Sequence, residues 1–127
     1  MILLDADVLI AFFRDREEEH SKAVELVQGS EERGVITTII LSEIITVIKS
    51  RDGGKKSMET WEKIIESDIA VVEIKEGIEQ IMYFVEKYDG LSFGDASNII
   101  IMKKFNIEKI ISFDSDFDLI PGIERIH

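Results

Sequence analysis

Near its start the chain reads ILLDADVLIAFF (residues 2–13), where three apolar residues run directly into an aspartate. A short run without polar residues is typical of a strand that is buried on both faces. The residues after the aspartate then favour a helix from about residue 8 to residue 13. This stretch therefore predicts a buried strand that is followed at once by a helix, an alternation that is typical of an α/β fold.

Further strands and helices are predicted to alternate along the rest of the chain. Apolar runs predict strands at residues 35–37, 69–74, 110–113 and, as a short fifth, 123–126. Helical spacing and end signals predict helices that start at the N-caps Asp15 and Ser57 or span residues 39–49, 75–88 and 92–105. This order implies a parallel sheet of four to five strands with helices on both faces, a three-layer α/β/α arrangement that forms one domain over residues 1–127.

The composition fits a protein that folds without disulfides. A chain of 127 residues buries roughly two-thirds of the surface that its unfolded form exposes. Cysteine is absent, which leaves no sign of an oxidising compartment or a zinc site. No secretory signal is visible, and the longest apolar stretch, residues 35–48, falls short of the roughly 20 residues of a membrane span. We therefore expect a soluble, cytoplasmic protein that does not use a membrane.

The net charge of −11 argues at first against a nucleic-acid binder, because phosphates attract lysine and arginine. A solvated acidic surface accounts for most of the glutamates, but carboxylates that hold a cation invert the charge that a substrate meets. The locally basic segment places four cations around Asp52, namely Lys49, Arg51, Lys55 and Lys56. This segment is either a solvated loop or a contact for RNA, and its residues do not decide between the two.

Four aspartates stand at or just beyond two predicted strand ends. Asp5 follows the first strand, Asp114 follows the fourth, and Asp7 and Asp116 come two residues later in each case. Ligands of such folds bind outside the carboxyl ends of the strands. Acids also cap helices that begin there, which is the simpler explanation of Asp7 and Asp116. Asp5 and Asp114 are the stronger functional candidates, because the same end of the sheet receives both.

Glu43 and Asp95 add two carboxylates that point with apolar side chains. Glu43 lies in the helix at 39–49, which is apolar on nearly every side and is expected to be deeply buried. A buried carboxylate needs a partner, which is either a Lys or Arg or a bound cation. Asp95 opens the last long helix on the face of Ile99 and Met102, although acids also favour helix N-termini for electrostatic reasons.

The four carboxylates of Asp5, Glu43, Asp95 and Asp114 together predict a metal site. At about 5 Å spacing and an effective dielectric constant near 20, each pair repels by about 3 kcal/mol. Such a group is stable only if some members are protonated or a divalent cation lies between them. An all-oxygen ligand set suits Mg²⁺ or Mn²⁺ and not zinc.

Four short motifs carry a resemblance to a known family. They are ILLD (residues 2–5), SE (42–43), LSFGDA (91–96) and SFDSDF (112–117). With these motifs in this order, the chain resembles PIN-domain nucleases and, in size, the VapC toxins of toxin–antitoxin pairs. The resemblance implies a catalytic and metal-binding quartet, with Asp116 beside it and Ser112 as the polar residue of the last motif; the quartet is Asp5, Glu43, Asp95 and Asp114. Asp7 stands where many members have Asn or Ser, and a contact of Asp7 with metal through water stays open.

The resemblance further implies a Mg²⁺-dependent endoribonuclease, with Mn²⁺ as an alternative ion. One or two ions would activate a water that attacks the RNA phosphodiester, leaving 5′-phosphate and 3′-hydroxyl ends. A cognate antitoxin whose C-terminal segment blocks the site, and a homodimer, are also implied. No protein nucleophile is required, in keeping with the absence of cysteine and of a Ser–His pair.

Two functions of other classes fit parts of the same pattern. A phosphoaspartate protein, either a receiver domain or a small phosphatase, also begins with an apolar strand and an Asp-x-Asp sequence, which would make Asp5 the phosphorylated residue. A receiver needs its acceptor after the third strand, but the nearest acid, Asp52, is predicted to lie in a glycine loop. The other alternative is a catalytically silent PIN-like module that binds a partner through Met58, Trp61 and Ile65 on one helix face.

Overall fold

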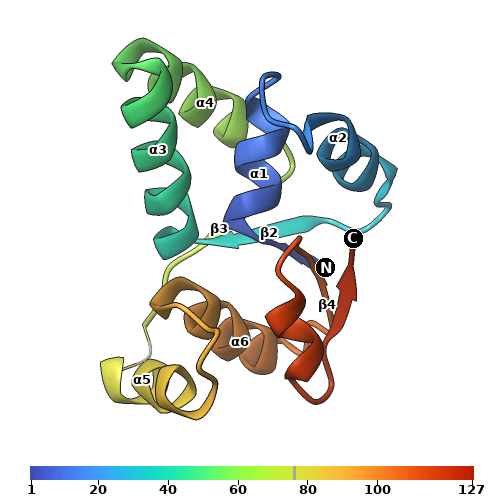
Figure 1. Cartoon of the computed structure of the whole chain (residues 1–127), viewed down its shortest axis with the longest axis vertical. Helices are drawn as coiled ribbons and strands as arrows, with labels where there is room; N and C mark the ends of the chain where they lie inside the picture. The colour runs from blue at the N-terminus through green and yellow to red at the C-terminus, as the bar shows by residue number, and fades with distance from the viewer. Residues whose placement is uncertain (76) are drawn as a thin grey trace.

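Five short parallel strands form one sheet in the computed structural model, which describes residues 1–75 and 77–127 (Figure 1). The strand order is β3-β2-β1-β4-β5, and every neighbouring pair is parallel. The strands are β1 Ile2–Leu4, β2 Gly34–Thr37, β3 Ala70–Val72, β4 Lys109–Ile111 and β5 Glu124–Ile126. The parallel sheet predicted from the alternation of elements is confirmed.

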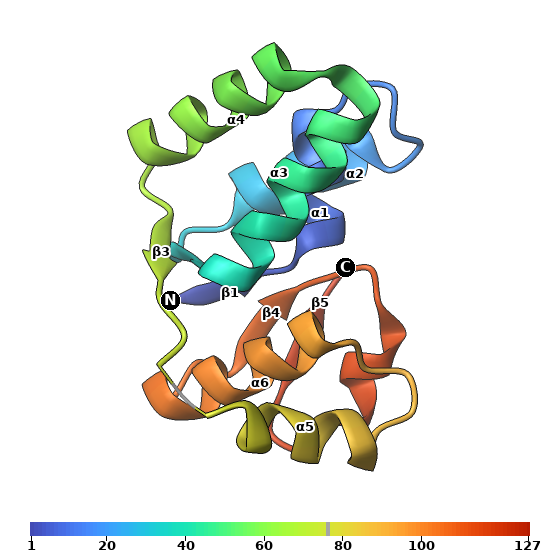
Figure 2. The same cartoon turned by 90° about the vertical axis from the view of Figure 1, so that its left-hand side faces the viewer.

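Helices cover both faces of this sheet. They are α1 Ala6–Phe13, α2 His20–Gly29, α3 Thr38–Asp52, α4 Gly54–Glu66, α5 Ile78–Lys87 and α6 Phe93–Phe105, with a short 3₁₀ helix, η1 Ser115–Leu119, between β4 and β5. The helices α1 to α4 lie on one side of the sheet, and α5 and α6 lie on the other (Figure 1, Figure 2). The predicted three-layer α/β/α arrangement is therefore confirmed.

The central strand β1 is buried on both faces, as its uninterrupted apolar run predicts. Ile2 and Leu4 pack into the core that α1 and α3 share, whereas Leu3 packs into the core beneath α6. The side chains alternate because successive residues of a strand point to opposite faces. The N–H of the next residue, Asp5, still donates to the carbonyl of Ile111 (3.0 Å), so Asp5 lies at the carboxyl edge of the sheet.

Helix α3 is less buried than its sequence predicts. Ile40, Ile44 and Ile48 are buried at every fourth position, whereas Leu41 and Ile45 line a groove between α3 and α4. Residue 43 of the same helix is exposed. The prediction that this helix is buried on nearly every side is wrong, because α3 extends beyond the sheet along α1 and α4 and its remaining side faces solvent (Figure 2).

Helix α2 begins later than predicted. It starts at His20, and Asp15 is not its N-cap, because residues 15–19 form turns. The side chain of Arg14, just before these turns, pairs with Asp52 at the end of α3 (Nε to Oδ2 2.6 Å). This long-range ion pair joins the end of α1 to the end of α3, and no local sequence pattern predicts it.

The loop predicted around residues 51–54 is almost entirely helical. Gly53 alone separates α3 from α4, and its φ of +92° is a backbone conformation that favours glycine. Ser57 is not the cap of α4 but lies within the helix, where its hydroxyl donates to the Gly54 carbonyl (2.7 Å). The chain therefore turns from one long helix into the next on a single residue.

The remaining predicted boundaries differ by a few residues. The strand predicted at 69–74 is β3, Ala70–Val72, and the helix predicted at 75–88 is α5, Ile78–Lys87. Residue 76 of that predicted helix lies outside the described residues. Within the described parts of the chain, every helix is too short or too polar to cross a membrane.

Candidate active site

The parallel pairing of β1 with β4 brings Asp5 and Ser112 together. Leu4 pairs with Ile111 in the sheet register, so the next residue of each strand lies at the same carboxyl edge. The Ser112 hydroxyl donates to Asp5 Oδ2 (2.7 Å) and accepts a hydrogen bond from the Asp114 N–H (3.0 Å). One serine thus fixes the carboxylate of Asp5 and the backbone of Asp114 relative to each other.

Asp5 is buried, with 4% of its surface exposed. Its Oδ1 accepts hydrogen bonds from the Ala6 N–H (2.9 Å), as the N-cap of α1, and from the Asn98 side-chain amide (3.2 Å). Burial raises the pKa of Asp5 to about 8, the nearby charges of Asp7 and Asp95 add to the rise, and the hydrogen bond from Ser112 opposes it. The site therefore contains a carboxyl group that resists ionisation unless positive charge is added.

Asp7 also faces this edge of the sheet. Its Oδ2 accepts a hydrogen bond from the Phe113 N–H (3.1 Å), just after β4, and its Oδ1 accepts from the Val8 N–H (2.6 Å). Burial raises the pKa of Asp7 to about 6, against the effect of both hydrogen bonds, and the charges of Asp114 and Asp95 contribute further. The N-cap role that the sequence allowed for Asp7 belongs to Asp5.

Asp114 and Asp116 reach the same region from the residues after β4. The Asp114 Oδ1 accepts a hydrogen bond from the Asp116 N–H (2.9 Å) and caps η1, so the capping role suggested for Asp116 belongs to Asp114. The charge of Asp114 raises the pKa of Asp116. The carboxyl group of Asp116 lies against Gly90, where an added Cβ atom would collide with it.

Asp95 is both a capping residue and a member of this group. Its Oδ2 accepts a hydrogen bond from the Ser92 N–H (3.0 Å), while its own N–H donates to the Ser92 hydroxyl (3.1 Å), which forms a capping box at the start of α6. Burial, followed by the charges of Asp114 and Asp116, raises the pKa of Asp95 against these hydrogen bonds. Asp95 therefore caps α6, as acids at helix N-termini often do, and also lies near the other carboxylates of this edge.

Glu43 reaches the group from α3, across the first turn of α6. Although the residue is exposed, its carboxyl group lies against Gly94, where an added Cβ atom would collide with it. Partial burial and the charge of Asp95 raise the pKa of Glu43. The absence of a side chain at position 94 thus lets a carboxylate of α3 approach α6, whereas the sequence analysis expected Glu43 in a fully buried helix.

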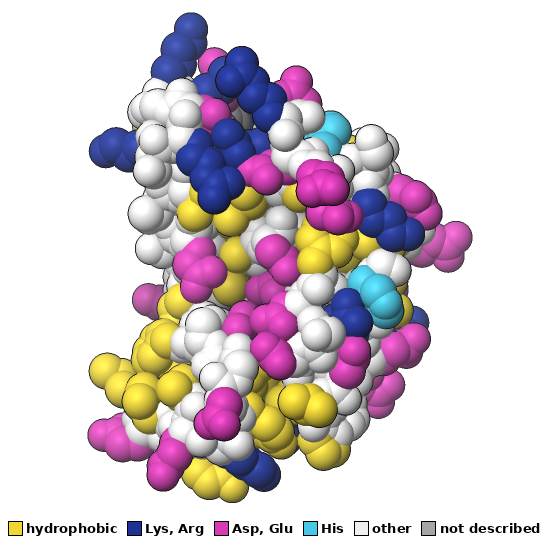
Figure 3. Space-filling view, in the orientation of Figure 1, with side chains coloured by type: hydrophobic (Ala, Val, Ile, Leu, Met, Phe, Trp, Pro, Cys, Tyr) yellow, Lys and Arg dark blue, Asp and Glu magenta, His cyan; other side chains and the backbone are white. Residues whose placement is uncertain are grey.

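We call the carboxylates at this edge of the sheet the acidic cluster; they are Asp5, Asp7, Glu43, Asp95, Asp114 and Asp116. Figure 3 shows acidic side chains gathered midway along the face it displays, between the two helix layers. Among the described residues, no member of the cluster forms an ion pair with Lys or Arg. Negative groups from distant parts of the chain therefore meet there, and the charge of Arg125 acts on Asp7 and Asp114 without forming an ion pair with either.

Three further residues contribute to the cluster and were not predicted from the sequence. Asn98 is fully buried, donates to Asp5, and leaves its own Oδ1 without a hydrogen-bond partner in the described structure. Gly94 makes room for Glu43. Arg125 of β5 donates to the Ser112 carbonyl (3.3 Å) and pairs with Asp118 (2.9 Å). A polar residue three positions after Asp95 was the one available signal, since positions i and i+3 share a helix face.

The cluster has the chemistry of a hard divalent cation site. All its donors are oxygens, and the orphaned Asn98 Oδ1 is one more. In residues 1–75 and 77–127, however, no three acidic or histidine side chains already stand as ligands of one ion. Burial, followed by repulsion from neighbouring carboxylates, raises the pKa values of Asp5, Asp7 and Asp95, and a bound cation would stabilise the ionised forms against both effects, so the residues fit such an ion.

The four residues of the predicted basic segment lie at the junction of α3 and α4. All are exposed, with Lys49 and Arg51 in the last turn of α3 and Lys55 and Lys56 in the first turn of α4. Arg51 and Lys56 line a cavity that is described below, and Lys49 and Lys55 are not part of its lining. The structure therefore divides the segment into two pairs.

Replacing Ser112 by alanine is expected to lower the free energy of unfolding by about 1–3 kcal/mol, because a buried hydrogen-bonding group loses its partner. The Asp114 N–H and the Asp5 carboxyl group would each lose the hydroxyl that they share. Urea denaturation would measure the change. Ser115→Ala is the matched control, since Ser115 is exposed, and a change within about 0.5 kcal/mol is expected there. Equal stabilities of the two variants would contradict this role of Ser112.

Comparisons with known proteins place this geometry in context. The family model described as PIN domain matches residues 2–123. Ribonuclease VapC13 of Mycobacterium tuberculosis is 26% identical over 132 residues, which cover 99% of each chain. Among solved structures, the Mycobacterium tuberculosis toxin VapC20, described as cleaving the sarcin–ricin loop, superposes with a TM-score of 0.84 at 20% identity over 94% of each chain. A toxin–antitoxin complex from Klebsiella pneumoniae gives a TM-score of 0.72 at 21% identity, over 98% of this chain and 96% of that one.

Proposed function

The chain belongs to the PIN-domain family, and we propose that it is a Mg²⁺-dependent endoribonuclease, the toxin of a VapBC-type toxin–antitoxin pair. The relative VapC13 is named a ribonuclease, and it matches this chain over almost its full length. We further propose that residues 1–127 act as one domain and that the protein works in the cytoplasm.

The observation that carries the proposal is the acidic cluster, whose six carboxylates form no ion pair with Lys or Arg among the described residues. Burial raises the pKa values of the carboxylates that follow β1 and lie on α3 and α6, and the charges of neighbouring carboxylates raise these values and that of Asp116 further. Such an arrangement is unfavourable for the fold alone, because neutral side chains at these positions would not repel. Positions that cost stability are expected where function requires them.

We assign the metal to Asp5, Glu43, Asp95 and Asp114, with Asp7, Ser112 and Asp116 in supporting roles. Bound there, Mg²⁺ or Mn²⁺ would supply activation of water and stabilisation of charge on the phosphate and the leaving 3′-oxygen. The chain itself orients these ligands: Ser112 holds Asp5, and the Ser92 capping box holds Asp95. A covalent protein intermediate is unnecessary, and products with 5′-phosphate and 3′-hydroxyl ends are expected.

Partners follow from the same proposal. The substrate is RNA, held weakly and in a salt-dependent way by exposed basic residues, among which Arg51 and Lys56 of the predicted basic segment line a basic cavity. A cognate antitoxin would inhibit the site, which accords with the resemblance of this fold to a chain of a toxin–antitoxin complex. A homodimer is the proposed assembly.

The phosphoaspartate alternative gains no support from the geometry. Asp5 is buried and its carboxyl oxygens already accept three hydrogen bonds, so a phosphodonor would have difficulty reaching it. Asp52, the other acceptor considered, lies in the last turn of α3 and pairs with Arg14, far from any strand end. The remaining alternative, a silent binding module, differs from the nuclease only in activity and is decided by the assay below.

Cleavage of single-stranded RNA by the purified chain is expected with Mg²⁺ or Mn²⁺ and is expected to disappear with excess EDTA. End analysis of the products should show 5′-phosphates and 3′-hydroxyls. Incubation of the same preparation with acetyl phosphate is the control for the rival function, and no labelled aspartate is expected. Labelling of Asp5 or Asp52 without cleavage would favour the phosphoaspartate protein, and neither signal would favour the silent module.

A further inference from the structure

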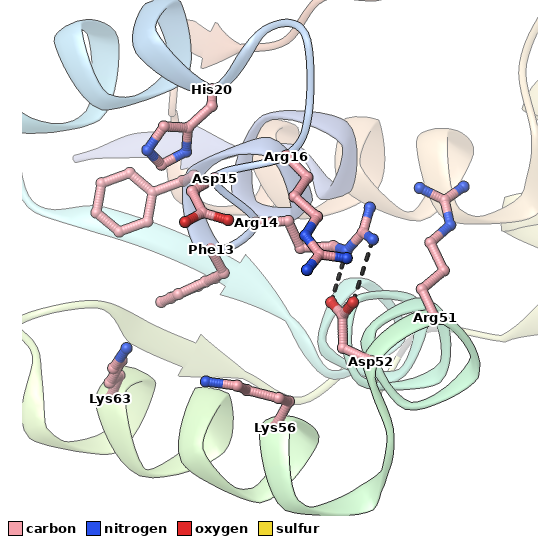
Figure 4. Close-up of a pocket in the computed structure, with 10 residues that line it drawn as sticks. Phe13, Arg14, Asp15, Arg16, His20, Arg51, Asp52, Lys56 and Lys63 are labelled. Atoms are coloured by element: carbon pink, nitrogen blue, oxygen red, sulfur yellow. Dashed lines mark hydrogen bonds and ion pairs between the residues drawn. The ribbon is translucent and has the colours of Figure 1, made fainter.

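A cavity of about 810 Å³ lies between the end of α1, the turns before α2 and the junction of α3 with α4 (Figure 4). It is separate from the acidic cluster and shares none of its residues. The residues that line it come from α1, the turns after it, α2, α3 and α4, and half of them are Lys or Arg. Nothing in the proposed metal chemistry uses this cavity.

The charge of the cavity is opposite to that of the whole protein. Five cationic residues line it against two acids, in a chain whose net charge is −11. The cations are Arg14, Arg16, Arg51, Lys56 and Lys63. Figure 3 shows Lys and Arg side chains gathered at one end of the face that also displays the acidic cluster. A concave basic site on an acidic protein raises the local concentration of anionic ligands.

Some of these cations are already paired, and the others are available. Arg14 pairs with Asp52 through two hydrogen bonds, which tie the end of α1 to the end of α3. Arg51 pairs with Glu17 of the turn region (Nη1 to Oε1 2.8 Å). Arg16 and Lys63, by contrast, form no ion pair with any described residue. The charge of Arg16 acts on Asp52 without forming an ion pair with it, so both cations can pair with a ligand.

The cavity also contains aromatic rings beside its cations. Phe12 and Phe13 line it, are only partly buried, and meet edge to face with their ring centroids 5.1 Å apart. Figure 4 places Phe13 between the arginines and Lys63. Bases of single-stranded nucleic acids stack on such rings and on arginine planes, while backbone phosphates pair with the cations. An acidic peptide would use the cations but has no need of the rings.

The helix α1 connects the cavity with the acidic cluster. Asp7 lies in its first turn, and Arg14 caps its other end. Eight helical residues span about 12 Å. A few nucleotides of extended single strand cover this distance, so one RNA strand can lie in both places.

We propose that this cavity is a second RNA subsite, in which Arg16 and Lys63 each pair with a backbone phosphate and Phe12 and Phe13 contact a base, a few nucleotides from the bond that is cut. The inference rests on the proposed function and makes it more specific, because it assigns the main RNA contact to the cavity and not to the whole basic segment. Arg51 and Lys56 complete the wall, whereas Lys49 and Lys55 have no part in it.

The test compares Arg16→Gln/Lys63→Gln with the matched double variant Lys49→Gln/Lys55→Gln. Both remove two exposed positive charges, but only the first changes the cavity. Binding of a labelled oligouridylate is measured in an Asp5→Asn background across a salt series. The cavity variant is expected to bind on the order of tenfold more weakly, and its salt slope is expected to fall by about 1.4 for two lost phosphate contacts. The control should stay within about twofold of the parent.

Cleavage kinetics in the background with native Asp5 provide the second measurement: KM is expected to rise in the cavity variant while kcat is unchanged. RNA binding that depends on Arg16 and Lys63 supports the inference even if the chain cleaves nothing, a result that would defeat only the proposed nuclease activity. Equal losses in both double variants would overturn the inference. So would oligoglutamate binding that is lost in the cavity variant while RNA binding is retained, which would assign the cavity to an acidic protein segment.

Discussion

Replacement of Asp5 by asparagine is expected to slow RNA cleavage by about a thousandfold, equivalent to roughly 4 kcal/mol of transition-state stabilisation. Asparagine has nearly the same shape but no charge, and in the proposed mechanism Asp5 is the carboxylate that holds the metal nearest to the strand ends. Single-turnover cleavage of a labelled RNA at saturating Mg²⁺ would measure the loss.

The fold of this variant should be intact, because the native site penalises charge at position 5. Burial and the neighbouring carboxylates raise the pKa of Asp5 to about 8, so a neutral side chain is tolerated there at least as well. Asp68→Asn is the control: Asp68 is exposed at the opposite edge of the sheet and pairs with Arg33 (3.4 Å). A variant at position 5 that cleaves as fast as this control would remove Asp5 from the catalytic residues.

The part of the site at the strand ends was predictable because a parallel sheet leaves little freedom there. An acid that directly follows an apolar strand lies at the carboxyl edge of the sheet. The pairing of Leu4 with Ile111 then brings Asp5 beside Ser112. The sequence does not show which strands are neighbours. Even so, two acid-ended strands in a five-stranded parallel sheet deliver their carboxylates to the same edge.

The contribution of the helices to the site could be predicted only in part. Glu43 was selected because its helix is rich in apolar residues, yet the structure leaves that side of α3 open and brings the carboxylate to the cluster by way of Gly94. A contact between two helices depends on their packing distance, which a glycine changes without altering the hydrophobic pattern. Asn98 likewise reads as one polar residue in an apolar helix until its bond to Asp5 is seen.

The turns were the least predictable part of the fold, for a related reason. Asp15 has the local chemistry of an N-cap. The neighbouring Arg14, however, forms an ion pair with Asp52, 38 residues later, and residues 15–19 form turns instead of the first turn of a helix. The same contact shapes the basic cavity. Local capping preferences of about 1 kcal/mol are easily outweighed by such tertiary interactions.

Without divalent metal, the protein is expected to lose stability as the pH rises from about 4 to about 8. Unfolded Asp5 releases its proton near the ordinary pKa of 3.8, whereas burial raises the pKa of the folded residue to about 8. In this window the folded state binds more protons than the unfolded state, so a rise in pH favours unfolding. The pKa of Asp7, raised to about 6, acts in the same direction over the lower half of the window. Each pKa unit corresponds to about 1.4 kcal/mol, which makes the total loss several kcal/mol.

Surface carboxyl groups have the opposite effect and act at lower pH. The pKa of Asp52 is lowered by its hydrogen bonds with Arg14, and that of Asp118 is lowered by Arg125. Their contribution is lost as the pH falls below their ordinary values, near 4. Above a pH of about 5, the stability profile therefore reports mainly on the acidic cluster.

Mg²⁺ or Mn²⁺ is expected to reverse the loss at high pH and to have little effect near pH 5, because the ion competes with protons for the same oxygens. At a free metal concentration about 100 times the Kd, binding adds about 2.7 kcal/mol of stability, or roughly 10 °C in Tm for a domain of this size. Thermal unfolding near pH 5 and pH 8, each with metal and with EDTA, measures both effects. In Asp5→Asn, the pH dependence should flatten and the response to metal should shrink. A Tm in EDTA that is equal at the two pH values, and unchanged by metal, would mean that the carboxylates are neutralised without an ion, and the reason for placing a metal among them would be lost.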